Sequence, residues 1–465
     1  MSSRPLNLLA HYLAEGYGRG LVPTADFDER WYVSQYPDVA GSGLTPFEHF
    51  VTIGLREGRR PKADFVPANQ NAGRRTTDPY AVEDASDIVA RRFQSLAPLP
   101  VFRIPGSQRR INLVTDSVGK GSLFGGVGTA IGVAGFWASA LGVPLRIITR
   151  TERAETQNVR DVLRLYGVRY GEVELVYSGY DAKDPIPLAD GEQFLTTSWW
   201  TTWGVRQSVS SERIVYLLQE DERMFYPYGD DRLCSTELLH DPKIRKIVNS
   251  ELLYNHFLNN DVDIKACNGL WFDPAFPQDI FYCEKRQSSE KKNFFFYARP
   301  NHLRNLFYRG LTVIVSAMEA GLLHPREWDF YFVGVGIPRL RLPGRVEPKI
   351  VEGLTWRNYA ALIRRMDLGF SLMDTPHPSY PPLDLAACGA AVVTNRHPGK
   401  EDLGRYSGLI ITADTPVPAM VDGLRAGIVL AKDEARRDEL YRQSQLSRSW
   451  EASLSAVIDS LTRVA

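Results

Sequence analysis

Short apolar strands alternate with helices from Arg109 onward, in two successive series. The first series runs through RINLVTD, a glycine-rich loop, IGVAGFWASALGV and PLRIITR, and continues with VELVYSG, QFLTTSWW, RIVYLLQ and RKIVNS. The second series runs through KNFFFYARP, WDFYFVGVG, LGFSLMD and AAVVTN. A strand, a helix and a second strand in this order are typical of a βαβ unit, and hence of a parallel sheet. The sequence therefore predicts an α/β fold with two Rossmann-like domains that face a cleft.

Length and charge restrict the function further. A chain of 465 residues is too long for one core and predicts about three domains. The 55 basic residues balance the 55 acidic ones without a long run of either sign, which disfavours bulk binding to nucleic acid. The four cysteines lack a Cys-x-x-Cys spacing, and no apolar run reaches the roughly 18 to 20 residues of a membrane helix. We expect a cytoplasmic protein.

The N-terminal region contains a duplicated unit. HYLAEGYGRGLVPTADF, from His11, and HFVTIGLREGRRPKADF, from His49, match at a constant offset, and helical spacing lies between them. Residues 1–67 are therefore predicted to form a small helical module, which is either a packing appendage or a docking module. Residues 68–108 are polar and then proline-rich, which predicts a linker with one helix near Ile88 to Leu96.

The glycine loop SVGKGSLFGGVGTA follows the first strand of the first series. Gly126 and Gly128 begin the spacing of a G-x-G-x-x-G motif, but Ile131 occupies the third position, so a dinucleotide dehydrogenase is poorly supported. Gly125 and Gly126 would still let a phosphate or an acceptor approach the backbone, and tight packing is the alternative.

Two arginines follow the first strand of the second series. In YARPNHLRN, Arg299 leaves the strand directly and Arg304 comes five residues later, at the start of the next helix. Ligands of open α/β folds bind at the carboxyl ends of the strands, so two guanidiniums there predict a diphosphate clamp. A solvated surface position is the alternative for Arg304.

The stretch LMDTPHPSYPPLDLAACGAAVVTN, Leu372 to Asn395, joins a buried strand to an Ala-rich helix. Its loop has four prolines in seven residues and is followed by a single acid, Asp384. Prolines restrict the backbone, so the loop is predicted to have one fixed shape that serves a function. A stiff loop in which Asp384 only caps or pairs on the helix is the alternative.

Several ordered motifs together carry a family resemblance. From about Arg109 to its end, the chain resembles the two-domain GT-B glycosyltransferases near family 4, and most closely the WsaF type of bacterial rhamnosyltransferases. The matching passages are YLLQEDERMFYPYGDD, ACNGLWFDPAF, YARPNHLRN, FVGVG and HPSYPPLDLAACGAAVVTN. The resemblance implies a GT-B fold with an acceptor domain over 109–275, a nucleotide-sugar donor domain over 276–445, and a terminal helix at 446–465 that packs back on the first domain.

The resemblance also assigns roles to the proline loop. In the family's Glu-x(7)-Glu motif the second carboxylate contacts the ribose of the nucleotide, and Asp384 stands at that position. The first carboxylate is missing, because Pro376 replaces it. The rigid loop would then meet the methyl group of a 6-deoxy sugar such as L-rhamnose, while His377, Ser379 and Tyr380 replace the lost hydrogen bonds. Gly334, in FVGVG, is a further predicted donor-binding residue.

The expected reaction transfers L-rhamnose from dTDP-L-rhamnose to a saccharide acceptor in bacterial surface polysaccharide or glycan synthesis. The two arginines would stabilise the departing phosphate, so neither a cofactor nor a metal is expected, and Asp261-Val-Asp263 is taken as a chance match to the metal motif of other glycosyltransferases. The family retains configuration. Asp116 and Glu220, which end strands of the first series, are candidates to orient the acceptor.

The expected partners are a nucleotide-sugar donor and an oligosaccharide or lipid-linked glycan acceptor. Nucleic acid is not expected, and peripheral contact with the inner face of the membrane or with glycan-assembly enzymes is left open. Two alternatives remain: a transferase for another nucleotide sugar, with UDP or GDP, and a non-catalytic sugar-binding relative. Pro376 and the shortened acid Asp384 are the departures that favour the second.

Overall fold

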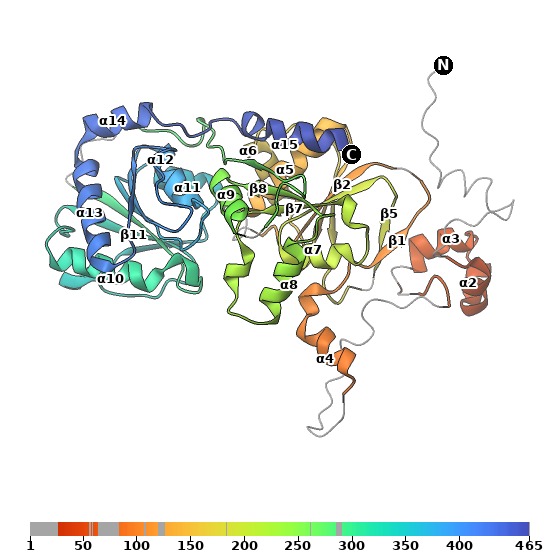
Figure 1. The fold of residues 1–465 in the computed structure, drawn as a ribbon. Helices are drawn as coiled ribbons and strands as arrows, with labels where there is room; N and C mark the ends of the chain where they lie inside the picture. Colours follow the sequence, from red (N-terminus) through yellow and green to blue (C-terminus); the bar gives the residue numbers. More distant parts are fainter. Residues whose placement is uncertain are drawn as a thin grey trace, which may run out of the picture.

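A computed structural model of the chain describes residues 27–54, 57, 59–63, 83–106, 108–119, 126–182, 184–260, 262–284 and 291–464. Two α/β domains lie side by side, and a small helical module lies at one end of the molecule (Figure 1). The first copy of the duplicated unit, Gly125 and Asp261 lie outside the described residues, except for the last residue of that copy, Phe27. Within the described part, the two predicted series of strands form two separate parallel sheets, which confirms the expected fold class.

The N-terminal domain contains a seven-stranded sheet with the order β4-β3-β2-β6-β7-β8-β9, in which every neighbouring pair is parallel. The strands are β2 (Arg110–Thr115), β3 (Leu145–Thr149), β4 (Val173–Tyr177), β6 (Glu192–Thr196), β7 (Ile214–Leu218), β8 (Arg245–Asn249) and β9 (Leu270–Phe272). The chain builds outward from β2 on one side and from β6 on the other. The topological switch point therefore lies between these two strands.

The C-terminal domain contains a six-stranded parallel sheet with the order β12-β11-β10-β13-β14-β15. The strands are β10 (Lys292–Ala298), β11 (Trp328–Gly334), β12 (Lys349–Glu352), β13 (Leu368–Phe370), β14 (Ala391–Asn395) and β15 (Ile410–Ala413). Its switch point lies between β10 and β13. The loops that leave these two strands contain Arg299 and the proline loop, so the fold brings the two predicted motifs to one crevice.

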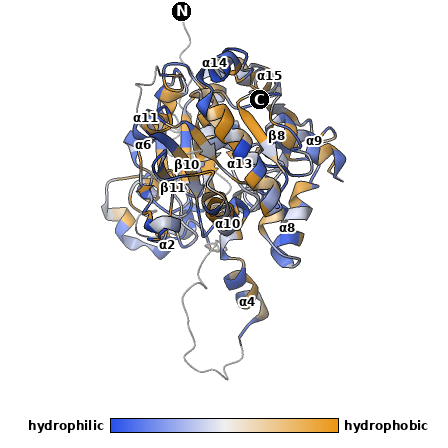
Figure 2. Ribbon diagram, turned by 90° about the vertical axis from the view of Figure 1, so that its left-hand side faces the viewer, coloured by the Kyte–Doolittle hydropathy of each residue, from blue (hydrophilic) through white to orange (hydrophobic). Residues whose placement is uncertain are grey.

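Helices cover the sheets. In the N-terminal domain these are α5 (Gly126–Leu141), α6 (Thr156–Leu165), α7 (Trp199–Arg206), α8 (Asp230–Leu239) and α9 (Glu251–Asn259). In the C-terminal domain they are α10 (Phe307–Glu319), α11 (Trp356–Ile363), α12 (Tyr380–Ala387), α13 (Val417–Lys432) and α14 (Glu434–Arg442). The central strands, such as β8, are coloured hydrophobic in Figure 2, whereas the outer turns of the helices carry hydrophilic residues. Both sheets are therefore buried between helical layers.

One predicted strand is shorter than the sequence suggests. QFLTTSWW was expected to be a strand, but β6 ends at Thr196, and the two tryptophans begin helix α7. The reason is a capping box. The Ser198 hydroxyl accepts a hydrogen bond from the backbone N–H of Thr201, and the Thr201 hydroxyl accepts one from the backbone N–H of Ser198. This local signal overrides the apolar strand pattern.

The terminal helix α15 (Trp450–Val464) returns to the N-terminal domain, as Figure 1 shows. Trp450, Leu454 and Val457 belong to the same hydrophobic cluster as α5 and the strand β2. The Trp450 ring stacks on Tyr166 with 4.5 Å between ring centroids. The chain end therefore ties the second domain to the first through apolar burial.

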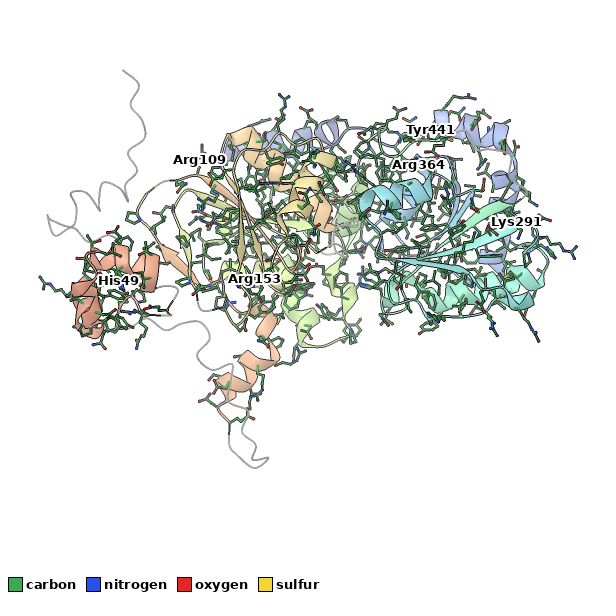
Figure 3. All side chains as sticks on the ribbon, turned by 180° about the vertical axis from the view of Figure 1, so that it is seen from behind. His49, Arg109, Arg153, Lys291, Arg364 and Tyr441 are labelled. Atoms are coloured by element: carbon green, nitrogen blue, oxygen red, sulfur yellow. The ribbon has the colours of Figure 1, made fainter. Side chains whose placement is uncertain are left out.

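The small module has its own aromatic core. Its described elements are α2 (Glu29–Gln35), the 3₁₀ helix η3 (Pro37–Gly41), α3 (Pro46–His49) and the π-helical turn η4 (Phe50–Gly54). Tyr32 is fully buried there and its hydroxyl lies 3.1 Å from Nδ1 of His49, inside the module at the end of the molecule (Figure 3). The preceding residue, Trp31, is half-buried, so Tyr32 is the core residue of these two neighbouring aromatic residues.

The predicted linker differs from the expectation at its C-terminal part. It contains α4 (Ala85–Arg92), the turn η5 (Gln94–Leu96) and β1 (Val101–Arg103), which pairs with β5 (Ile186–Leu188). Leu96 and Leu99 are buried in the core of the N-terminal domain, and Phe102 is buried in the module core. This segment is therefore part of the N-terminal domain and its contact with the module, because its scattered apolar residues fill gaps that no periodic pattern reveals.

Two shortened chains test this boundary. A chain that begins at residue 83 retains Leu96 and Leu99 and is expected to fold with a cooperative thermal transition. A chain that begins at residue 109 lacks both side chains, each worth roughly 2–5 kcal/mol when a buried leucine is removed, and is expected to aggregate or to melt at a much lower temperature. The two melting temperatures are compared by circular dichroism. The chain that begins at residue 83 carries Phe102→Ser, because the ring of Phe102 packs in the core of the module and would be exposed without it. Equal melting temperatures would restore the boundary at 109.

Candidate functional site

A cavity of about 280 Å³ lies between the two domains. Three residues of the N-terminal domain line it, namely Gly126, Gln219 and Glu220. The other lining residues come from the C-terminal domain: Tyr297, Arg299, His302, Arg304, Asn305, Val333, Gly334, Val335, Val351, Glu352, Gly353, Leu354, Trp356, Tyr359, Met373, His377, Ser379, Tyr380, Pro381 and Asp384. The cavity therefore lies at the carboxyl ends of the parallel strands.

The sequence-predicted residues meet in this cavity with few exceptions. All the predicted donor-binding residues line the cavity, namely Arg299, Arg304, Gly334, His377, Ser379, Tyr380 and Asp384. Gly126 and Glu220, predicted for other roles, line it too. Asp116 is not among the lining residues, and Gly125 lies outside the described part of the chain.

Arg299 follows β10 directly, beside the end of β11. Ala298 and Gly334 are partners in the register of these strands, and a Cβ atom on Gly334 would lie 1.8 Å from the Ala298 carbonyl oxygen and 3.3 Å from Cγ of Arg299. Only glycine therefore permits this close approach. Nε of Arg299 is buried and has no hydrogen-bond partner among the described residues, so the guanidinium retains a donor for a ligand.

Arg304 lies in the short 3₁₀ turn η8 (Leu303–Asn305) and faces the N-terminal domain. Its Nη1 is 3.2 Å from Oε1 of Glu220, and its guanidinium carbon lies 4.0 Å from the centre of the Phe225 ring. Both partners follow β7. The alternative of a solvated surface position for Arg304 is thus excluded, because an ion pair and a cation–π contact hold it at the interface of the domains.

The proline loop holds His377 as a neutral donor. The backbone N–H of Ser379 donates to Nδ1 of His377 at 3.0 Å, so the ring proton belongs on Nε2, which has no partner among the described residues. Burial lowers the pKa of His377 to about 3, and the nearby Lys400 and Arg304 add to this effect. The imidazole is therefore uncharged at neutral pH, and its Nε2–H remains available for an acceptor oxygen.

Ser379 has a strained backbone, with φ of +67° and ψ of +147° immediately before helix α12. Such a conformation costs a non-glycine residue about 1–3 kcal/mol. Pro381 and Pro382 follow within the first turn and supply no backbone N–H, so this helix end offers few amide donors to a phosphate. The polar atoms that this part of the chain offers to the cavity are therefore mainly those of side chains.

Asp384 is 4% exposed and faces the cavity from α12. Its Oδ2 accepts a hydrogen bond of 3.0 Å from the Tyr359 hydroxyl, and its Oδ1 has no partner among the described residues. Burial raises the pKa of Asp384 to about 8, against the opposing effect of the Tyr359 hydrogen bond. The side chain is therefore a neutral acid at pH 7, with one oxygen turned to a partner and one left for a ligand.

Tyr380 connects the two domains. Its hydroxyl lies 2.5 Å from the Thr129 hydroxyl on α5 and accepts a 2.7 Å hydrogen bond from the Asn249 side chain at the end of β8. Asn249 also donates to Gln219, whose amide donates to the Gly126 carbonyl oxygen at 2.8 Å. The hydroxyl of Tyr380 is thus engaged in the domain contact, which leaves its ring rather than its hydroxyl to line the cavity.

Asp116 directly follows β2, at the switch point of the N-terminal sheet. Its carboxylate accepts hydrogen bonds from the Trp200 indole at 2.8 and 3.0 Å and from the Tyr180 hydroxyl at 3.2 Å. Burial raises the pKa of Asp116, and these hydrogen bonds oppose the rise. The acid is therefore surrounded by aromatic rings outside the cavity lining, and its suggested role toward an acceptor stays a prediction.

Three polar residues that sequence reasoning missed fix the loop at Met373. Asn395 pairs with both the N–H and the carbonyl oxygen of Met373, at 2.6 and 3.0 Å. Lys400 is fully buried and its ammonium donates to the same carbonyl at 2.6 Å, while the Asn305 amide donates to the Leu372 carbonyl at 3.3 Å. No local motif marks these residues, and only the register of β13 and β14 brings them together.

Metal-ligating residues do not cluster in the described part of the chain, where no group of three or more His, Cys, Asp or Glu side chains could hold an ion. Asp263, of the Asp-x-Asp match, accepts the Ala266 amide at 2.9 Å in a local turn. Among the helices of the described residues, none combines the length and apolar character needed to cross a membrane.

Two parallel α/β domains that share a cavity at the carboxyl edges of their sheets are typical of the GT-B glycosyltransferases. Family profiles agree with this class: WsaF, N-terminal domain, matches residues 110–251, and WsaF, C-terminal domain, matches residues 292–425. Together the two matches cover more than half of the chain, in the order of the two domains. The protein belongs to the WsaF type of GT-B glycosyltransferases.

Similar proteins agree with this fold. The O-antigen biosynthesis protein RfbC of Myxococcus xanthus is 27% identical over 277 residues, which are 57% of this chain and 20% of RfbC, so the chain spans a fifth of the length of that curated relative. TarM matches with a TM-score of 0.52 and 10% identity over 77% of this chain and 99% of its own. Anabaena Alr3699/HepE, in complex with UDP and glucose, matches with a TM-score of 0.51 and 12% sequence identity. The match covers 76% of this chain and 99% of the Anabaena chain. These two likenesses show the fold alone.

Asp384→Asn tests the buried acid. The folded protein keeps Asp384 protonated up to about pH 8, whereas the unfolded chain loses this proton near pH 3.8. The raised pKa of Asp384 therefore stabilises the fold fully below about pH 3.8. This contribution is lost as the pH rises through about pH 8, by up to about 1.4 kcal/mol per pH unit. An amide cannot ionise, so the melting temperature of the variant should gain on that of the natural protein between about pH 5 and about pH 8.5. A difference that stays constant over this range would show that Asp384 is ionised in the fold.

Proposed function

We propose that this protein transfers L-rhamnose from dTDP-L-rhamnose to a saccharide acceptor during synthesis of a bacterial surface polysaccharide. The observation that carries the proposal is the interdomain cavity, which Arg299, Arg304 and the neutral acid Asp384 all line. Membership in the WsaF type supports the transfer of a sugar from a nucleotide donor. The similarity to RfbC, an O-antigen biosynthesis protein, supports a polysaccharide product.

The two arginines suit a leaving nucleoside diphosphate. As the bond between the anomeric carbon and the phosphate oxygen breaks, its electron pair moves to the phosphate, and two guanidiniums stabilise the added charge without a metal. The acceptor oxygen bonds to the anomeric carbon and its proton passes to the departing phosphate, with retention of configuration. The neutral Nε2–H of His377 supplies a further hydrogen bond to a phosphate or sugar oxygen in the same cavity.

The proline loop supports a 6-deoxy sugar. Pro376 stands where a carboxylate would bind sugar hydroxyls, and the hydroxyl of Tyr380 is already engaged by Thr129 and Asn249. The loop lines the cavity with Pro381 and the ring of Tyr380, and this rigid carbon surface suits a methyl group better than a primary alcohol. Asp384 would meet the ribose through its unpartnered Oδ1.

A panel of nucleotide sugars tests the donor. We expect dTDP-L-rhamnose to raise the melting temperature more than UDP-glucose or GDP-mannose at equal concentration, because binding to the folded state alone stabilises it. Transfer is then measured with short synthetic oligosaccharides and dTDP release as the readout. Equal or greater stabilisation by a UDP-hexose would move the donor to the alternative class. Binding without transfer to any acceptor would favour a sugar-binding relative, for which the missing carboxylate at Pro376 is the specific observation.

Arg299→Ala tests the diphosphate clamp. Loss of a charged hydrogen-bond donor should weaken dTDP binding by about 1.5–3 kcal/mol, as measured by titration calorimetry. Arg309→Ala is the matched control, because Arg309 lies on the following helix and donates at 3.0 Å to the Thr415 carbonyl oxygen, outside the cavity lining. It should bind dTDP as the natural protein does. Full affinity in Arg299→Ala would locate the diphosphate elsewhere.

A further inference from the structure

One arginine of the predicted diphosphate clamp is held by the opposite domain. Arg304 belongs to the C-terminal domain, but its ion-pair partner Glu220 and the aromatic ring of Phe225 both belong to the N-terminal domain. The side chains of Arg304 and Glu220 are 21% and 13% exposed, so the pair is largely removed from solvent. A protein anion thus occupies one face of the guanidinium that a ligand anion would use.

Glu220 is only partly satisfied in this pair. Its Oε1 contacts Arg304, but its Oε2 is buried and has no hydrogen-bond partner among the described residues. Burial raises the pKa of Glu220, while Arg304, a hydrogen bond with the Thr375 side chain and the fully buried Lys400 oppose the rise. A buried carboxylate with one unused oxygen in a ligand cavity is poised for another hydrogen-bond donor.

A diphosphate and Glu220 cannot both approach Arg304 closely without mutual repulsion, because like charges a few ångströms apart in a partly buried site repel strongly. The diphosphate carries the larger charge and also contacts Arg299, so it wins the competition. The carboxylate of Glu220 then loses its partner but still lines the cavity. An acceptor hydroxyl is the group that can take the place of the guanidinium.

We propose that donor binding displaces Glu220 from Arg304, and that the released carboxylate accepts a hydrogen bond from a hydroxyl of the acceptor saccharide next to the attacking one, whose own proton passes to the departing phosphate. This inference rests on the proposed function, since it uses Arg304 as a diphosphate ligand. It assigns an order to the reaction: the donor binds first and completes the acceptor subsite. Without donor, Glu220 stays paired and the acceptor finds no carboxylate.

Glu220→Gln gives a signature that a purely structural ion pair would not. The amide removes the anion that competes for Arg304, so dTDP should bind at least threefold more tightly in titration calorimetry. The same change removes the acceptor's carboxylate, so turnover with the donor that the panel identifies should fall at least tenfold. Glu212→Gln is the matched control, because Glu212 is an exposed acid 3.8 Å from Lys243; it should change neither value. If Glu220 only joins the domains, its loss should weaken dTDP binding instead.

The outcomes separate this inference from the function on which it rests. If the natural protein binds dTDP but Glu220→Gln binds it no more tightly, or keeps full turnover, the exchange is wrong and the donor assignment stands. If the natural protein binds none of dTDP, UDP and GDP, the proposed function itself fails. Should the glutamine variant not fold, Glu220→Asp retains the charge but draws it back from Arg304 by one methylene. This variant should also bind dTDP more tightly and turn over more slowly, to a smaller degree than the glutamine variant. If binding and turnover both rise or both fall, the proposal is overturned.

Discussion

The hydroxyl of Tyr380 is the contact on which the geometry of the cavity depends. It reaches from the proline loop of the C-terminal domain to Thr129 and Asn249 of the N-terminal domain, with both partners within 2.7 Å. The ion pair of Arg304 with Glu220 and the packing of α15 also join the domains, but Tyr380 is the residue that fixes the proline loop itself relative to α5 and β8. Because prolines restrict the loop's backbone, this contact at its end also limits the positions open to His377.

The cavity keeps several buried polar atoms without partners, which folding alone would not favour. Nε of Arg299, Oε2 of Glu220, Nε2 of His377 and Oδ1 of Asp384 all lack a hydrogen bond among the described residues, and all four side chains line the same space. An unsatisfied buried group costs roughly 1–3 kcal/mol. Such groups are expected where a ligand supplies the missing partners, so stability is given up for recognition at this one place. The apolar clusters of both sheets and of α15 compensate for the loss.

The sequence predicted the domains and most of the site because both follow from local patterns. Strand periodicity located the sheets, and the rule that ligands bind at the carboxyl ends of parallel strands located Arg299 and the proline loop. Contacts between distant segments could not be predicted. Tyr359 reaches Asp384 from a helix without any motif, and Lys400 reaches Met373 only because β13 and β14 are neighbours. The family pattern gave Asp384 its place but not its protonation, which depends on burial that no local pattern reveals.

The replacement of a glutamate by Asp384 has a consequence of its own. The shorter side chain remains within reach of the Tyr359 hydroxyl and 96% of its surface is removed from solvent, so the neutral form is the stable one at pH 7. A neutral acid can donate one hydrogen bond and accept others, whereas a carboxylate only accepts. In the proposed complex, Asp384 would meet a ribose hydroxyl without placing a second negative charge near the diphosphate. Pro376 also removes the other carboxylate of the family motif. The cavity then has Glu220, an ionisable acid whose charged form is favoured by two cations, Arg304 and Lys400. The charge lost from the C-terminal domain is thus supplied by the N-terminal one, on the side from which an acceptor would approach.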